Sequence, residues 1–222
     1  MLAGEAVAAI WNGIAPEGRD QFYDWHINEH IPERVGIPGF RRGRRYIAAD
    51  ADAQPEFFTL YETDTMQVLQ GSDYTNRLND PTPWTKATTA WFRDTARALS
   101  RVIVSRGPGA GGVMLTIRFD CDDQHVAAIQ ALVCAAGQAA RVSGAHLCRG
   151  DRAASAMLTA ESKDRTDIQA PPNCFIMIEA TDAGALRHIL PERALSDAGA
   201  RGPFVRGVYR LEYSRTKTAF TA

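Results

Sequence analysis

The sequence predicts an α+β fold of two tandem βαββαβ units, whose sheets either stack face to face or continue edge to edge into a barrel. Strand and helix patterns follow the same order in the two halves of the chain, which indicates a repeat. A glycine- and proline-rich run at residues 107–112 separates the halves. A βαββαβ unit leaves one sheet face bare, so two units in one chain are expected to cover each other.

The elements are expected in the following order. The first unit, residues 1–106, has a strand at 6–12, a helix at 17–35, strands at 40–48 and 56–63, a helix at 66–78, a proline-marked break at 79–83, a helical stretch through Trp84, Trp91 and Phe92, and a strand near 101–105. The second unit, residues 113–222, has a strand at 113–119, a helix at 124–141, strands at 145–149 and 174–180, a helix at 183–194 and a strand at 205–213. The run at 107–112 opens onto a strand and not a helix, so it is interpreted as a linker and not as a phosphate loop.

Composition excludes several classes of partner. The chain has 222 residues, is 45% hydrophobic and carries a net charge of −1, so a globular protein with no general attraction for nucleic acid or an anionic membrane is expected. Four cysteines without CxxC spacing indicate reduced thiols, and the N-terminus lacks the basic start of a secretory signal. A cytoplasmic location follows as an expectation.

The predicted helix at 17–35 carries the strongest chemical signal. At about 100° per residue, His26 and His30 fall inside its apolar arc with Tyr23, while Trp25 and Glu29 flank the arc. A proline at position 32 is expected to kink or loosen the helix just beyond His30. His30 is therefore predicted as a general acid or base, with His26 as its partner and Glu29 as the carboxylate that orients it.

Two other interpretations of the histidines stay open. They fit equally well as hydrogen-bonded structural residues of the core. The spacing from His26 to His30 also matches H-x-x-E-H, an inverted zincin pattern, but no downstream helix supplies the third ligand that zinc requires. No metal and no organic cofactor is therefore expected.

The strand at 40–48 is rich in arginine. Alternation places Arg42, Arg44 and Tyr46 on one face and Arg45 on the other, together with Arg41. A guanidinium on the inward face is expected to hold a substrate carboxylate, phenolate or enolate. Salt bridges to glutamates 29, 33 or 62 explain the same residues equally well.

Further residues are candidates for a substrate pocket between the sheets. Tyr61 on the third strand and Trp11 with Asn12 at the end of the first strand are expected to complete an aromatic pocket, with core packing as the alternative. The further candidates for substrate binding are Tyr23, Trp25 and Tyr46. On the second unit's second strand, either His146 or Arg149 could face the shared cavity. The first helix of that unit has no counterpart of the histidines, so the first unit is expected to supply the acid–base groups.

The stretch from Trp25 to Tyr46 resembles the helix-to-strand signature of EthD-like proteins in the dimeric α/β-barrel superfamily. The match covers about the first hundred residues and involves Trp25, Glu29, His30, Pro32, Pro38, Gly39, Phe40, Arg45 and Tyr46. This resemblance implies ferredoxin-like βαββαβ domains that pair into a barrel, commonly as a homodimer of single-domain chains. The superfamily includes cofactor-free monooxygenases, isomerases, lyases and haem-handling enzymes, so the fold does not fix the reaction.

Together, these observations predict a cofactor-independent enzyme that acts by acid–base chemistry on a small cyclic or aromatic metabolite, as a lyase, isomerase or monooxygenase. The alternatives are a non-catalytic carrier for a small molecule and a metal- or haem-binding barrel. The expected partner is a small-molecule ligand, and a homodimer formed through remaining sheet edges is left open.

Overall fold

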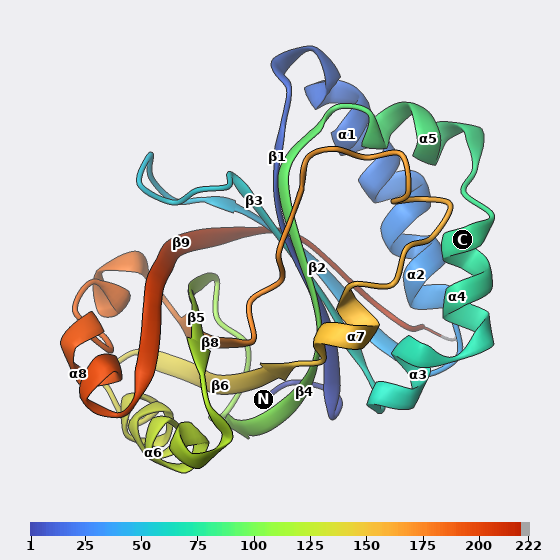
Figure 1. The fold of residues 1–222 in the computed structure, drawn as a ribbon. Coiled ribbons are helices and arrows are strands. Elements are labelled where there is room, and N and C mark those ends of the chain that lie inside the picture. Colours follow the sequence, from blue (N-terminus) through green and yellow to red (C-terminus); the bar gives the residue numbers. More distant parts are fainter. Residues whose placement is uncertain (219–222) are drawn as a thin grey trace.

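A closed barrel of antiparallel strands organises the part of the chain that this computed structural model describes, residues 1–218 (Figure 1). The strands are β1 (Ala6–Ile14), β2 (Phe40–Ala48), β3 (Phe57–Thr63), β4 (Phe92–Arg106), β5 (Val113–Cys121), β6 (Val142–Gly150), β7 (Ile168–Gln169), β8 (Cys174–Ala180) and β9 (Ala200–Thr216). Eight of them follow the order β1-β3-β2-β9-β5-β8-β6-β4, and β4 pairs back onto β1. Short β7 adds to β4 in parallel.

Each half of the chain contributes a four-stranded sheet, and the two longest strands join the sheets. Strand β4 has 15 residues and pairs with β1 of its own half and with β6 of the other half. Strand β9 has 17 residues and likewise pairs with both β5 and β2. The barrel therefore closes within one polypeptide, which confirms the predicted fold class.

The barrel interior is filled by side chains from both halves. Trp11 lies at its centre, with ring centroids 5.0 Å from Phe58 and 5.2 Å from Phe175. Tyr46 and Tyr209 are also fully buried in this cluster. Because alternate residues of a strand point to opposite faces, the neighbours of these residues point outward, toward the helices.

The helices cover the outside of the barrel, one set on each half (Figure 1). Those of the first half are η1 (Pro16–Gly18), α1 (Arg19–Trp25), η2 (His26–His30), α2 (Ile31–Gly36), α3 (Met66–Gln70), α4 (Ser72–Asn79) and α5 (Pro83–Thr89). Those of the second half are η3 (Asp123–His125), α6 (Val126–Ala136), α7 (Arg152–Ser155), η4 (Ala183–Leu186) and α8 (Glu192–Asp197). Within residues 1–218, no helix has both the length and the apolar character that crossing a bilayer requires.

Several predicted boundaries are wrong, and each error has a local cause. Trp91 and Phe92 are not helical, because α5 ends at Thr89 and Phe92 begins β4, nine residues before the expected strand. The helix expected at 183–194 is two short pieces, since Pro191 cannot continue the first and instead precedes α8. The helix expected at 124–141 ends at Ala136, next to Gly137.

Candidate functional site

The helix that carries the two histidines widens where they occur. Residues His26–His30 form a π-helical turn, in which the Ile31 N–H donates to the His26 carbonyl five residues earlier. The α-helix resumes at Ile31 with Pro32 in its first turn, where a missing N–H costs no hydrogen bond. The loosening predicted just beyond His30 therefore occurs one turn earlier, and it includes both histidines. Such turns are frequent at functional sites.

Both histidines line a cavity of about 300 Å³, which lies outside the barrel between the first sheet and the first-half helices. Its first-half walls come from β1, β3 and β4 and from the helical turn at Trp25–His30. These residues are Ile10, Asn12, Trp25, His26, His30, Thr59, Tyr61, Phe92, Thr95 and Arg97. The expected cavity between the two sheets is thus displaced to the helical side, because large side chains fill the interior.

The second half supplies the remaining wall through the β6–β8 connection, residues 151–173. It leaves the second half, passes between β4 and the first-half helices, and returns to β8 (orange in Figure 1). Several contacts anchor it to the first half, among them the pairing of β7 with β4 and two groups of side chains. Glu161 forms an ion pair of 2.5 Å with Arg34, and Thr95 Oγ1 lies 2.6 Å from both Asp167 and Arg165. Both halves therefore enclose the cavity.

Burial keeps both imidazoles neutral. It lowers the pKa of His26 well below the ordinary value, and the charge of Arg45 lowers it further. Burial also lowers the pKa of His30 well below the ordinary value, with added contributions from Arg34 and His26. The two residues are 3% and 8% exposed, and the Nδ1 atom of each is buried without a hydrogen-bond partner among the described residues. No described residue thus supplies the hydrogen bond that the structural interpretation assigned to one of them.

Aromatic side chains hold the two imidazoles in place. The Trp25 ring lies 4.1 Å from the His30 ring and 5.3 Å from the His26 ring, centroid to centroid. Tyr61 packs edge-on to His30 at 6.2 Å. Its hydroxyl is buried without a partner in the described chain, and burial raises its pKa well above the ordinary value, so it stays a proton donor.

Glu29 does not orient the histidines. Its Oε1 atom accepts hydrogen bonds from Thr82 at 2.6 Å and Thr85 at 3.3 Å, both near the start of α5. The Thr85 hydroxyl in turn accepts from Trp25 Nε1 at 3.1 Å. The expected direct contact between Glu29 and a histidine is therefore absent among the described residues. Glu29 instead acts through Thr85, which holds Trp25 against His30.

The three arginines proposed to bind an anion are all occupied by carboxylates and lie outside the cavity lining. Arg42 and Arg44 point into the barrel and share Glu62, and Arg44 also contacts Glu179 at 2.9 Å. Arg45 pairs with Glu212 on β9. Salt bridges, the alternative to anion binding, therefore account for the arginines of this strand. One partner, Glu62, was among the expected glutamates, and the other two, Glu179 and Glu212, come from the second half of the chain.

Asn12 lines the cavity, but four other candidates lie away from it. Trp11 and Tyr46 are in the barrel interior, and Tyr23 packs under Arg45 at 4.5 Å. His146 lies inside the barrel, where its Nε2 is 3.2 Å from Glu179.

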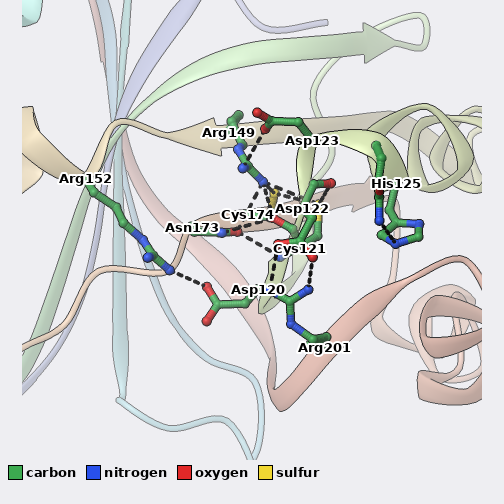
Figure 2. A network of polar contacts seen from close by, with 11 residues as sticks. Asp120, Cys121, Asp122, Asp123, His125, Arg149, Arg152, Asn173, Cys174 and Arg201 are labelled. Atoms are coloured by element: carbon green, nitrogen blue, oxygen red, sulfur yellow. Dashed lines mark hydrogen bonds and ion pairs between the residues drawn. The ribbon is translucent and has the colours of Figure 1, made fainter.

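Arg149, the alternative to His146 on the same strand, belongs to a polar network at the end of β5 (Figure 2). Its guanidinium pairs with Asp123 at 2.8 Å and contacts the sulfur atoms of Cys121 and Cys174. Neither it nor His146 lines the cavity.

The H-x-x-E-H spacing has no third ligand beside it. Among the described residues, no group of three or more histidine, cysteine, aspartate or glutamate side chains is placed to hold a metal ion. The carboxylate of Glu29 is instead bound to threonine hydroxyls.

Sequence reasoning missed two parts of the site. Arg97 and Thr95 lie on β4, in a region from which no strand was expected. The alternation of small buried Ala96 and Ala98 with larger residues is a strand signal that could have located them. The β6–β8 connection has no periodic pattern, so nothing in its sequence pointed to the first half.

Comparisons with known proteins bear on the fold. No protein-family model and no curated protein matches the sequence. An anthrone oxidase-like protein is 12% identical over 95% of this chain and 92% of its own, with a TM-score of 0.61. A presumed monooxygenase from Fusobacterium nucleatum is 9% identical over 97% and 96%, with a TM-score of 0.57.

A mutant chlorite dismutase from Candidatus Nitrospira defluvii is 9% identical over 94% of this chain and 92% of its own, with a TM-score of 0.50. At such low identity these matches describe the fold and not the reaction. The chain therefore shares with these solved structures an α+β barrel fold, here built from two ferredoxin-like βαββαβ units of one polypeptide.

Proposed function

We propose that this chain is a cofactor-independent enzyme that acts by acid–base chemistry on a small cyclic or aromatic metabolite. One observation carries the proposal: two neutral imidazoles without hydrogen-bond partners among the described residues line one aromatic cavity. A structural histidine in a core is normally hydrogen-bonded, so two buried rings with an unbonded Nδ1 indicate a function that needs them free.

His30 is the proposed general base, and His26 is its partner. Their lowered pKa values keep the basic form present at neutral pH, so the ring is ready to accept a proton from carbon or oxygen. The imidazolium is costly in this buried site, and the substrate anion formed next to it offsets that cost. The Tyr61 hydroxyl is the proposed donor to the substrate oxygen.

The proposal includes the reaction class, which is that of a lyase, an isomerase or a cofactor-free monooxygenase. A lyase, isomerase or cofactor-free monooxygenase would each begin with such a proton transfer, and the EthD-like signature around His30 supports this group of reactions. The similarity to an anthrone oxidase-like protein suggests a polycyclic probe substrate. We also propose a cytoplasmic location, because all four cysteines are free thiols. Assembly into a homodimer is not needed to close the barrel.

Anthrone is the proposed test compound, since its acidic methylene protons report on base catalysis directly. The wild-type protein is expected to accelerate exchange of these protons with D₂O above the buffer rate. In air it should form anthraquinone and water from anthrone and O₂ in equal amounts. His30→Gln is expected to lower both rates by about 10²-fold, as for loss of a general base.

The matched control is His188→Gln, which removes an exposed histidine of the second half. It should leave both rates unchanged. If His30→Gln keeps the wild-type exchange rate while folded normally, the base assignment is wrong. If anthrone binds and neither exchanges nor oxidises, a carrier is the better description.

A further inference from the structure

We propose that Arg97 is the anion-binding residue of this cavity, and that the natural substrate carries a carboxylate on an aromatic ring system. This inference rests on the proposed function, because it names the substrate class of the same site. Arg97 lies on β4, pairs in register with Ile10 of β1, and lines the cavity with it. Its half-buried guanidinium forms no hydrogen bond or ion pair with any described residue.

Two other arginines near the cavity, Arg34 and Arg165, differ from Arg97 because each has a carboxylate partner. Arg34 pairs with Glu161 at 2.5 Å and with Glu33 at 3.3 Å. Arg165 pairs with Asp167 at 2.6 Å. Glu161 also lines the cavity, but its charge is taken up by Arg34.

The cavity lining therefore has one positive charge that no described side chain offsets. Both histidines are neutral and add no charge of their own. An anionic ligand would supply the missing partner, whereas a cationic ligand would be repelled by Arg97.

The form of the site selects one kind of anion. A guanidinium presents parallel N–H donors that match the two oxygens of a carboxylate. A phosphate would bring about two negative charges at neutral pH to a wall with one free cation among its described residues. A phenol, with a pKa near 10, is uncharged at neutral pH before binding. A carboxylate is ionised in solution and needs only one guanidinium.

The other walls suit a flat apolar ring. Trp25 and Phe92 are buried aromatic residues of the lining, and Ile10 lies beside Arg97 across the strand pair. Stacking on such walls orients a planar ligand, while the guanidinium fixes which end of it faces β4. Arg97 would thus position the ring for proton transfer and is a specificity residue, not the base.

Binding of cinnamate and its neutral amide, cinnamamide, tests the proposal by calorimetry at neutral pH. The wild-type protein is expected to bind cinnamate about 10- to 100-fold more tightly than cinnamamide, the range typical of a charge-assisted hydrogen bond. Arg97→Gln should weaken cinnamate binding by the same factor and leave cinnamamide binding unchanged. Arg97→Lys keeps the charge without the fork and should retain part of the preference.

Arg101→Gln is the matched control, because Arg101 lies on the same strand, is exposed and does not line the cavity. It should keep the full preference for cinnamate. The proposal is overturned if the wild-type protein does not prefer cinnamate, an outcome that does not depend on the folding of any variant. It is also overturned if Arg97→Gln folds normally and keeps the preference. His30→Gln should also keep the preference, so a failed base assignment and a failed anion site give different results.

Discussion

Replacing Arg44 with methionine is expected to lower the free energy of unfolding by about 3–5 kcal/mol, the usual cost of removing one member of a buried ion cluster. The Arg44 side chain is 1% exposed, and both its partners, Glu62 and Glu179, are fully buried. Methionine fills much of the volume of the arginine stem but leaves the Glu179 carboxylate with His146 and the Gly111 amide as its partners among residues 1–218. Urea unfolding followed by tryptophan fluorescence measures the loss.

The control for this change is Arg41→Met on the same strand. Arg41 pairs with Asp64 at the surface, and such pairs contribute at most about 1 kcal/mol. A second variant, Arg44→Met with Glu179→Gln, removes the uncompensated charge and is expected to recover part of the stability. If Arg44→Met unfolds at the same urea concentration as Arg41→Met, then the cluster is solvated and the barrel interior is not closed at this end.

The same cluster shows why the arginine-rich strand was hard to interpret from sequence. Alternation along the strand correctly predicted that Arg42, Arg44 and Tyr46 share one face, but it could not predict which residues pack against that face. Glu179 lies 135 residues from Arg44 and reaches it only because β2 pairs with β9 and β8 lies across the barrel. Ion pairs between the two halves depend on how the sheets join into the barrel, so they cannot be predicted from local sequence patterns.

The order of elements, in contrast, was predictable because it depends on local periodicity. The repeated βαββαβ order and the position of the histidines on one helix follow from spacing within about 20 residues. The location of the cavity depends instead on side-chain volume in the barrel and on the path of the β6–β8 connection. Trp11 fills the space that was expected to hold a ligand, and the aperiodic connection builds the actual pocket wall on the other side of β4.

Lowering the pH from 7.5 to 5.5 is expected to reduce the free energy of unfolding by up to about 4 kcal/mol, because burial disfavours the charged form of three histidines in the folded protein. Burial lowers the pKa of His26, His30 and His146. As the pH falls through about 6.5, these histidines therefore bind protons in the unfolded chain but not in the folded chain. Stability is fully present above that pH and is lost as the pH falls through it, by up to about 1.4 kcal/mol per histidine over this range.

The carboxylate of Glu179 acts in the same direction but at lower pH. Burial raises its pKa, but hydrogen bonding to His146 and the charge of Arg44 outweigh burial and hold the pKa at about 2. Its contribution is lost only as the pH falls below about 4.5, so the range from 7.5 to 5.5 isolates the histidines. Urea unfolding at three pH values within that range measures the slope.

Replacing both His26 and His30 with glutamine should reduce this pH-dependent loss to at most about 1.4 kcal/mol, the largest share that His146 can contribute over this range. Replacing exposed His188 with glutamine should leave the loss unchanged. An equal loss in the double variant would mean that the cavity histidines titrate alike in the folded and unfolded chain, which would contradict the lowered pKa values that the buried site gives them. The stability measurement thus tests the protonation state on which the proposed chemistry depends, without knowledge of the substrate.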